Sequence, residues 1–184
     1  ELYSNIKMNT GDIILYTASR TPSRWWLFDA FIDIFTWSEW VHVGIVVKDP
    51  SWIDTKGTYL WESSITKEKF GVQMAPLDDR IVPGSTYYRK FKGEPIDMDK
   101  LKKIYDDVHD KPYDVDPLDW VKAFLGLKSH PQRENSFWCS ALVACILTKA
   151  GVLDKDTDWS EVAPKFFGDG YHQAYGPVKK YNII

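Results

Sequence analysis

Cys139 is the residue whose position most clearly suits chemistry. It stands in the first turn of a helix that the apolar spacing predicts over residues 138–150. Unpaired backbone N–H groups and the helix dipole favour an anion at such a place, and the thiolate is the nucleophilic form of cysteine. The other cysteine, Cys145, falls deeper in the apolar stripe and is predicted to be a core residue. A packed, inert thiol is the alternative for Cys139, because free cysteine is often buried.

His42 and Glu62 are two further residues with chemical potential, and both lie in predicted strands. Strand alternation puts His42 on one face with Gly44, whose missing side chain is expected to leave open space there. A carboxylate such as Glu62 is costly in an apolar strand unless it has a partner. An antiparallel hairpin centred near Trp52 would place His42 directly opposite Glu62. Taken singly, each also suits a plain role, namely a half-buried histidine bonded to backbone and a glutamate that points to solvent.

Together these residue types are the parts of a thiol hydrolase. Such an enzyme needs a nucleophile, a base and a third group that orients the base. This chemistry requires no metal and no cofactor, and the chain contains neither an H-E-x-x-H nor a C-x-x-C pattern.

The elements that must position these residues predict a single α+β domain over residues 1–184. Apolar or β-branched runs between turn signals predict strands at 11–16, 41–47, 58–63, 71–77 and 85–91. Helical spacing predicts helices at 24–37, at 118–125, at 138–150 and along the stripe of Leu101, Ile104, Tyr105 and Val108.

The helix ends are also expected from capping rules. Asp97 or Asp99 is the expected N-cap of the helix that carries the Leu101 stripe. The helix that begins near the cysteine is expected to have Asn135 or Ser136 as its N-cap, while glycine at its far end favours a left-handed cap.

Bulk composition is that of an ordinary globular domain and argues against nucleic-acid binding. Of the 184 residues, 44% are hydrophobic and 27% charged, as in ordinary globular domains, and a net charge of -3 argues against a nucleic-acid partner.

Two cysteines six positions apart on a helix lie roughly 9 Å apart. A disulfide needs Cα atoms within about 7 Å. Free thiols suit a soluble protein of a reducing compartment. No leader pattern is visible, but the chain starts at Glu1, which leaves a removed leader open.

Five motifs occur in a telling order: GDIILY, WVHVGIVV, LWES, KPYD and FWCSALV. In this order and spacing, over most of residues 11–151, the chain resembles the NlpC-type papain-like superfamily. More narrowly, it resembles the circularly permuted branch that includes the YiiX-like and poxvirus-type proteins. The unpermuted branch has the cysteine motif before the histidine strand, whereas this chain has histidine, glutamate and then cysteine. Residues beyond 151 have no counterpart in the resemblance.

The resemblance implies a permuted papain-like fold with a central antiparallel sheet packed against helices. It implies Cys139 as nucleophile, His42 as base and Glu62 as the acid that orients the base. It also implies that Tyr113 and Ser140 lie near the nucleophile, although Tyr113 equally suits a buried tyrosine after a helix end. The remaining histidines match no motif position and are expected at the surface: His109, His130 and His172.

The implied reaction is cleavage of an amide or ester bond through an acyl-enzyme, with hydrolysis and acyl transfer both open. The superfamily includes peptidases, other amidases and lipid acyl hydrolases or acyltransferases, so the expected partner is a small molecule, peptide or lipid with such a bond. Two alternatives remain open. One is a catalytically silent module that binds a lipid or peptide. The other is a redox-responsive protein that uses Cys139 as a sensor.

Aromatic residues are concentrated between Trp25 and Trp40. This segment precedes the histidine strand and carries apolar residues on several faces, more than a one-sided core helix needs. It suits a lid, an acyl-chain groove or an interfacial membrane contact, and equally the core of a small domain. Its basic residues do not outnumber its acidic ones, so constitutive membrane binding is not predicted.

Overall fold

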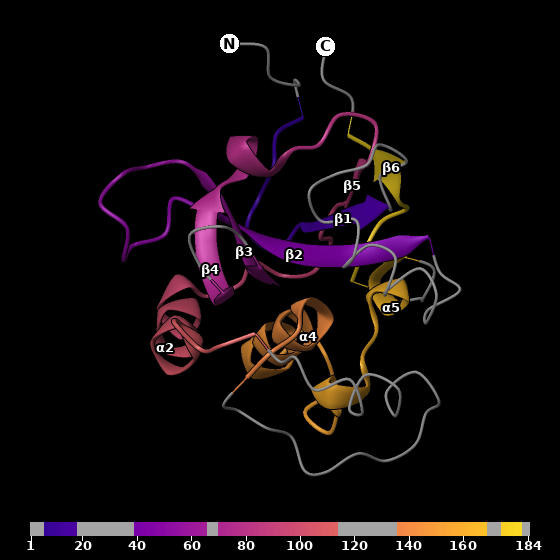
Figure 1. Cartoon of the computed structure of the whole chain (residues 1–184). Helices are drawn as coiled ribbons and strands as arrows, with labels where there is room; N and C mark the ends of the chain where they lie inside the picture. The colour runs from indigo at the N-terminus through magenta and orange to yellow at the C-terminus, as the bar shows by residue number, and fades with distance from the viewer. Residues whose placement is uncertain (1–5, 18–38, 66–69, 114–135, 169–173, 182–184) are drawn as a thin grey trace.

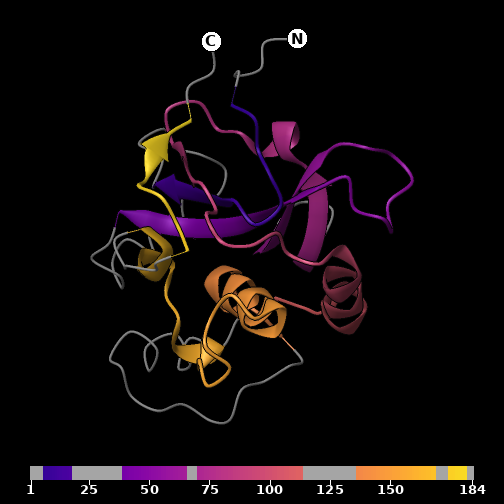
Figure 2. The same cartoon turned by 180° about the vertical axis from the view of Figure 1, so that it is seen from behind.

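The computed structural model contains a six-stranded antiparallel sheet with helices against one of its faces (Figures 1 and 2). It describes residues 6–17, 39–65, 70–113, 136–168 and 174–181. The strands are β1 (Ile13–Thr17), β2 (Trp40–Lys48), β3 (Thr58–Ile65), β4 (Phe70–Pro76), β5 (Thr86–Arg89) and β6 (Lys179–Lys180), in the sheet order β4-β3-β2-β1-β5-β6. The helices are α2 (Met98–Val108), α4 (Cys139–Ala150) and α5 (Pro164–Gly168), with 3₁₀ turns η1 (Leu77–Arg80) and η2 (Trp159–Glu161).

The prediction of an α+β fold is confirmed, as are the five predicted strands and the two helices that fall within the described residues. Asp97 is the N-cap of α2, where its carboxylate accepts a hydrogen bond from the N–H of Asp99. The helices predicted at 24–37 and 118–125, and most of the aromatic segment, lie outside the described residues. The short elements η2, α5 and β6 were not expected, because two to five residues are too few for periodicity to reveal.

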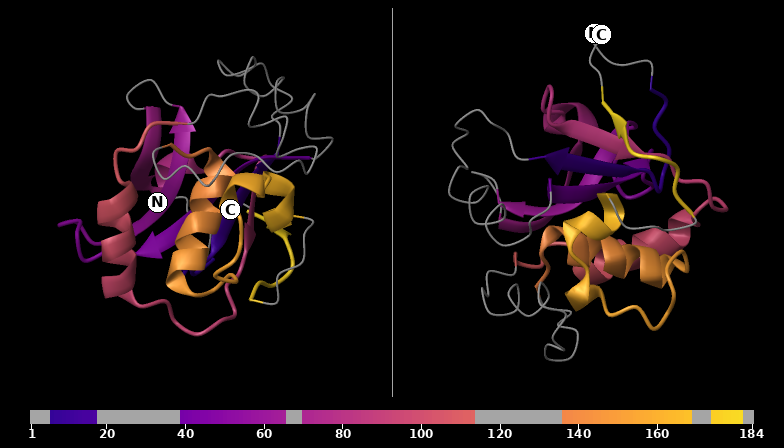
Figure 3. Two further views of the ribbon diagram at one scale, coloured as in Figure 1. Left: turned by 90° about the horizontal axis from the view of Figure 1, so that it is seen from below. Right: turned by 90° about the vertical axis from the view of Figure 1, so that its right-hand side faces the viewer.

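Two apolar clusters lie on the two faces of the sheet. The larger cluster joins β2 residues such as Val43 and Ile45 to α4, which is buried at every position from Cys139 to Leu147. A helix that is apolar on all sides is expected to be buried, and Figure 3 shows α2, α4 and α5 gathered on one side of the sheet. The second cluster covers the opposite face and includes Leu77 of η1. Among the described residues, no helix is long and apolar enough to cross a membrane.

The start of β2 departs from strict strand alternation. Consecutive β1 residues Tyr16 and Thr17 pair with His42 and Trp40, so the register passes over Val41. Strict alternation would put Val41 on the same face as Val43 and Ile45 of the larger cluster, but it packs in the second cluster instead. This irregularity has the geometry of a bulge, which bends a strand and redirects the side chains beside it. It lies immediately before His42.

The register predicted for the β2–β3 hairpin was wrong by two residues. The observed pairs run from Lys48 with Thr58 to Ile45 with Trp61. Continued along the strands, this register puts Gly44 rather than His42 opposite Glu62. A shift of two residues preserves the side-chain alternation, so His42 and Glu62 still lie on the same face as diagonal neighbours.

The space above Gly44 is filled rather than open, which corrects a second expectation. A Cβ built at Gly44 would lie 2.8 Å from two side-chain carbons of Leu60. Leu60 is fully buried, so it has little room to move away. Glycine is therefore required at this position by the close packing of Leu60 across the hairpin.

We expect Gly44→Ala to lower the free energy of unfolding by about 1 to 3 kcal/mol, the usual cost of inserting a carbon into a packed core. Urea unfolding followed by tryptophan fluorescence measures the change. Gly57→Ala is the matched control in the same hairpin, because a Cβ there would meet its nearest atom at 3.5 Å. Equal unfolding midpoints for the two variants would contradict the close packing at Gly44.

Candidate active site

Helix α4 begins at Cys139, with Trp138 as its N-cap and no side-chain hydrogen bond to the cap. The expected N-cap Ser136 is wrong, and Asn135 lies outside the described residues. The reason is that the preceding chain is held extended: Phe137 forms a parallel bridge with Tyr113. The first-turn N–H groups of α4 therefore lack a side-chain cap, which leaves them suited to hold a negatively charged oxygen.

Hydrogen bonds to Phe137 hold the chain segment that leads to Cys139. The Ser63 hydroxyl in β3 donates a hydrogen bond of 2.5 Å to the carbonyl oxygen of Phe137. The N–H of Phe137 donates to the carbonyl of Pro112. These contacts hold the start of α4 against β3. Cys139 is thereby placed near the start of β2, where His42 lies. Its residue surface is only 3% exposed.

His42 is the residue that joins the other two predicted site residues. Its Nε2 lies 2.7 Å from Oε2 of Glu62, and Cys139 lies near enough to the ring to raise the pKa of the imidazole. With Nε2 turned to the carboxylate, Nδ1 is the ring nitrogen that remains for another partner. The structure thus brings Cys139, His42 and Glu62 together. The Glu62 side chain is 4% exposed, and that of His42 is 23% exposed.

The surroundings of His42 favour its protonated form. Burial opposes the charge and lowers the pKa, but the negative charge and hydrogen bond of Cys139, followed by those of Glu62, outweigh it and raise the pKa of His42 to about 10. The imidazolium is therefore the stable form at neutral pH. It has the Glu62 carboxylate at Nε2 and Cys139 nearby.

The surroundings of Glu62 favour its ionised form. Burial raises the pKa of the carboxyl group, but the hydrogen bond and charge of His42, the charge of Arg80 and a hydrogen bond from Ser64 together lower it below its ordinary value. The ionic contact from Nε of Arg80 to Oε1 measures 3.2 Å, and the Ser64 hydroxyl donates to the same oxygen at 3.2 Å. Each carboxylate oxygen therefore has its own partners.

Three residues around His42 and Glu62 were missed by sequence reasoning: Tyr16, Ser64 and Arg80. The Tyr16 ring lies against the His42 ring, with centroids 5.3 Å apart. Strand alternation places Ser64 on the same face as Glu62, so its contact was foreseeable. Arg80 had no sequence signal, because it reaches Glu62 from the 3₁₀ turn that follows β4.

The two residues that the resemblance places near the nucleophile, Tyr113 and Ser140, are both buried. Ser140 is completely buried, and its hydroxyl donates a hydrogen bond of 2.6 Å to the carbonyl of Val162, which assigns it a packing contact. Tyr113 is also buried, and its backbone lies beside Phe137, two residues before Cys139. Cys145 is fully buried in the larger cluster, as expected.

The other histidines do not join this arrangement where the structure describes them. His109 follows α2, and its side chain is 43% exposed. His130 and His172 lie outside the described residues. In the described part of the chain, no group of three or more histidine, cysteine or acidic residues is arranged to hold a metal ion.

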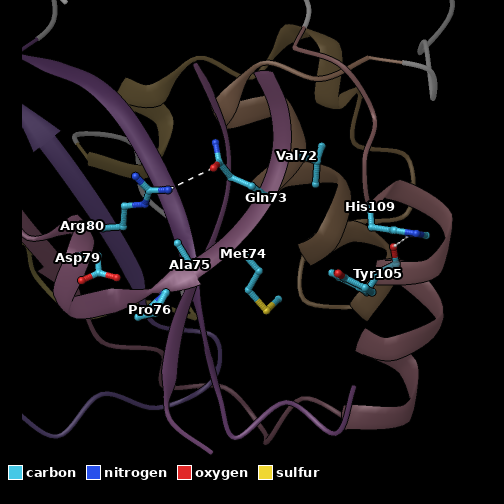
Figure 4. Close-up of a pocket in the computed structure, with 9 residues that line it drawn as sticks. All are labelled: Val72, Gln73, Met74, Ala75, Pro76, Asp79, Arg80, Tyr105 and His109. Carbon is cyan, nitrogen blue, oxygen red and sulfur yellow. Dashed lines mark hydrogen bonds between the residues drawn. The ribbon is translucent and has the colours of Figure 1, made fainter. Parts of the chain in front are cut away.

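A groove of about 630 Å³ lies beside this arrangement, between β4 and the end of α2. Figure 4 shows Met74 of β4 facing Tyr105 of α2 and His109 just after that helix, with Gln73 and Arg80 at the opposite side. None of Cys139, His42 or Glu62 lines the groove, whereas Arg80 both lines it and contacts Glu62.

Comparison with models of protein families, with curated proteins and with solved structures found no match to the chain.

We expect Cys139→Ala to lower the pKa of His42 by more than about one unit, because the thiolate is the largest group that raises it. The chain has four histidines, so NMR titration of the imidazole ring protons can follow each one. Cys145→Ala is the matched control, since it removes a buried thiol from the same helix. An unchanged His42 titration in Cys139→Ala would show that thiol and imidazole are not coupled.

Proposed function

We propose that this chain is a cysteine hydrolase that cleaves an amide or ester bond through an acyl-enzyme on Cys139. One observation carries the proposal: Nε2 of His42 lies 2.7 Å from the Glu62 carboxylate, and Cys139 lies near enough to the same ring to raise its pKa. A nucleophile, a base and a group that orients the base are the minimum for this chemistry. The position of Cys139 at the start of α4 adds backbone N–H groups that suit an oxyanion.

In the first step, the Cys139 thiolate attacks the carbonyl carbon of the substrate and forms a C–S bond. The N–H of Cys139 holds the oxygen that becomes negative. His42 then gives its Nδ1 proton to the leaving nitrogen or oxygen as the C–N or C–O bond breaks. Glu62 keeps the ring in place through Nε2 and offsets its positive charge.

In the second step, neutral His42 removes a proton from water or from another acceptor, which attacks the thioester carbonyl. The C–S bond breaks and releases the acid or the transferred acyl product. Cys139 returns to the thiolate and His42 to the imidazolium. Neither step consumes an oxidant, a reductant or a cofactor.

We further propose that the fold is of the permuted, NlpC-type papain-like kind. The chain order of histidine, glutamate and cysteine supports it. So does an antiparallel sheet that carries the histidine and glutamate on adjacent strands, with the cysteine at the start of a helix packed on that sheet. The expected substrate is a peptide, another amide or a lipid acyl compound.

A second candidate is a catalytically silent module that binds a lipid or peptide. The burial of Cys139, which is 3% exposed, favours this candidate, because a nucleophile must be reached by its substrate. The two candidates predict different behaviour. A hydrolase has a thiol that reacts with electrophiles, and it turns over a substrate. A binding module does neither.

Alkylation by iodoacetamide separates the two candidates. We expect selective labelling of Cys139 over Cys145, because Cys139 lies at the start of α4 near the His42 imidazolium, whereas Cys145 lies in the larger cluster. Intact-protein mass spectrometry over a range of pH measures the rates. His42→Ala should weaken the low-pH labelling. Labelling of Cys139 no faster than that of a model thiol would exclude the hydrolase and leave the binding module.

Turnover is tested with a panel of p-nitrophenyl esters, peptide amides and phospholipids. We expect Cys139→Ala to abolish cleavage, and His42→Ala to slow it by about 10²- to 10⁴-fold, the usual contribution of a general acid–base group. The rate of acylation should fall as the pH rises through about 10, because His42 then loses the proton that it gives to the leaving group. Turnover that survives Cys139→Ala would contradict the mechanism.

A further inference from the structure

Arg80 closes a ring of polar contacts around one oxygen of Glu62. Its Nη2 donates to Oε1 of Gln73 at 3.2 Å, the contact drawn in Figure 4. The Gln73 amide donates to the Ser64 hydroxyl at 2.6 Å, and that hydroxyl donates to Oε1 of Glu62. The Nε of Arg80 lies 3.2 Å from the same Glu62 oxygen and completes the ring. This contact is an ion pair, because its geometry does not meet that of a hydrogen bond.

The ring determines which carboxylate oxygen is available to His42. Oε1 of Glu62 is held by Arg80 and Ser64, so the carboxylate presents Oε2 to the imidazole. Rotation of the carboxylate would break the contacts at both oxygens in a setting where the side chain is only 4% exposed. A buried polar group without partners is costly, so the held orientation is strongly preferred.

The backbone of Arg80 also contacts Tyr16, the other side chain that lies against His42. Its carbonyl oxygen accepts a hydrogen bond of 3.0 Å from the hydroxyl of Tyr16. The Tyr16 ring in turn lies against the His42 ring, at 5.3 Å between centroids and 45° between planes. The end of η1 thus contacts both side chains that flank the imidazole.

We propose that Arg80 is a positioning residue for His42. Its side chain fixes the Glu62 carboxylate, its carbonyl fixes Tyr16, and the two together hold the imidazole with Nδ1 toward Cys139. The proposal deepens the proposed function and rests on it for the catalytic consequence, but the arrangement itself is measurable in a protein that does not turn over.

A competing explanation is that Arg80 only neutralises a buried charge. A lysine would do that equally well, because it carries the same charge. It could not bond to Glu62 and Gln73 together with the planar geometry of a guanidinium. Positioning and neutralisation therefore predict different results for Arg80→Lys.

The test compares Arg80→Met, Arg80→Lys and Gln73→Met with wild type. Gln73 is partly exposed, so Gln73→Met breaks the ring without removing a charge and serves if Arg80→Met fails to fold. Lys102→Met is the matched control: it also removes one positive charge, from an exposed ion pair with Asp106 on α2.

The first readout is the downfield NMR signal of the His42 Nε2 proton that is shared with Glu62. We expect it in wild type and Lys102→Met, and we expect it to move upfield or disappear in Arg80→Met and Gln73→Met. Arg80→Lys should lie between. An unchanged signal in both Arg80→Met and Gln73→Met overturns the proposal, and full recovery in Arg80→Lys reduces Arg80 to a neutralising charge and also overturns it.

The second readout is the rate of Cys139 alkylation as a function of pH. Its acid limb is the range in which this rate falls as the pH is lowered. Because Arg80 lowers the pKa of Glu62, its loss lets the carboxyl take up a proton at higher pH. We expect the limb to move to higher pH in Arg80→Met, with a lower rate of alkylation on that limb. Failure of the proposed function looks different: the wild-type thiol would be inert, while the NMR signal still reports whether Arg80 positions His42.

Discussion

The structure around His42 depends on the burial of the Glu62 carboxylate. A charged group that is 4% exposed must find partners within the protein, because water can no longer solvate it. His42, Arg80 and Ser64 supply these partners from β2, η1 and β3. Three segments that meet at one carboxylate are thereby fixed relative to one another, and the position of the imidazole follows from that arrangement.

The charges alternate along the resulting series. After Cys139 come the imidazolium of His42, the carboxylate of Glu62 and the guanidinium of Arg80, in that order. Each ion has at least one neighbour of opposite charge, which offsets the cost of burial that an isolated ion would carry. The high pKa of His42 is a consequence of this order, because Cys139 and the Glu62 carboxylate both raise it.

The hairpin shows why a wrong register still gave a correct contact. The predicted pairing was displaced by two residues, and side chains alternate with a period of two. His42 and Glu62 therefore kept their shared face, and their side chains are long enough to meet diagonally. The expectation of open space at Gly44 failed for a related reason: alternation gives the face of a neighbour but not its conformation, and Leu60 leans over the glycine.

The sequence by itself determined the α+β class, the five main strands, both helices that can be compared, and the candidate residues Cys139, His42 and Glu62. Periodicity and residue type are local properties, so they are readable along the chain. Only the tertiary structure decided the N-cap of α4, the bulge before His42 and the contact of Arg80 with Glu62. These depend on which segments meet in space: an extended pairing at Phe137 delays the helix, and η1 brings a residue 18 positions away to a carboxylate that β3 has buried.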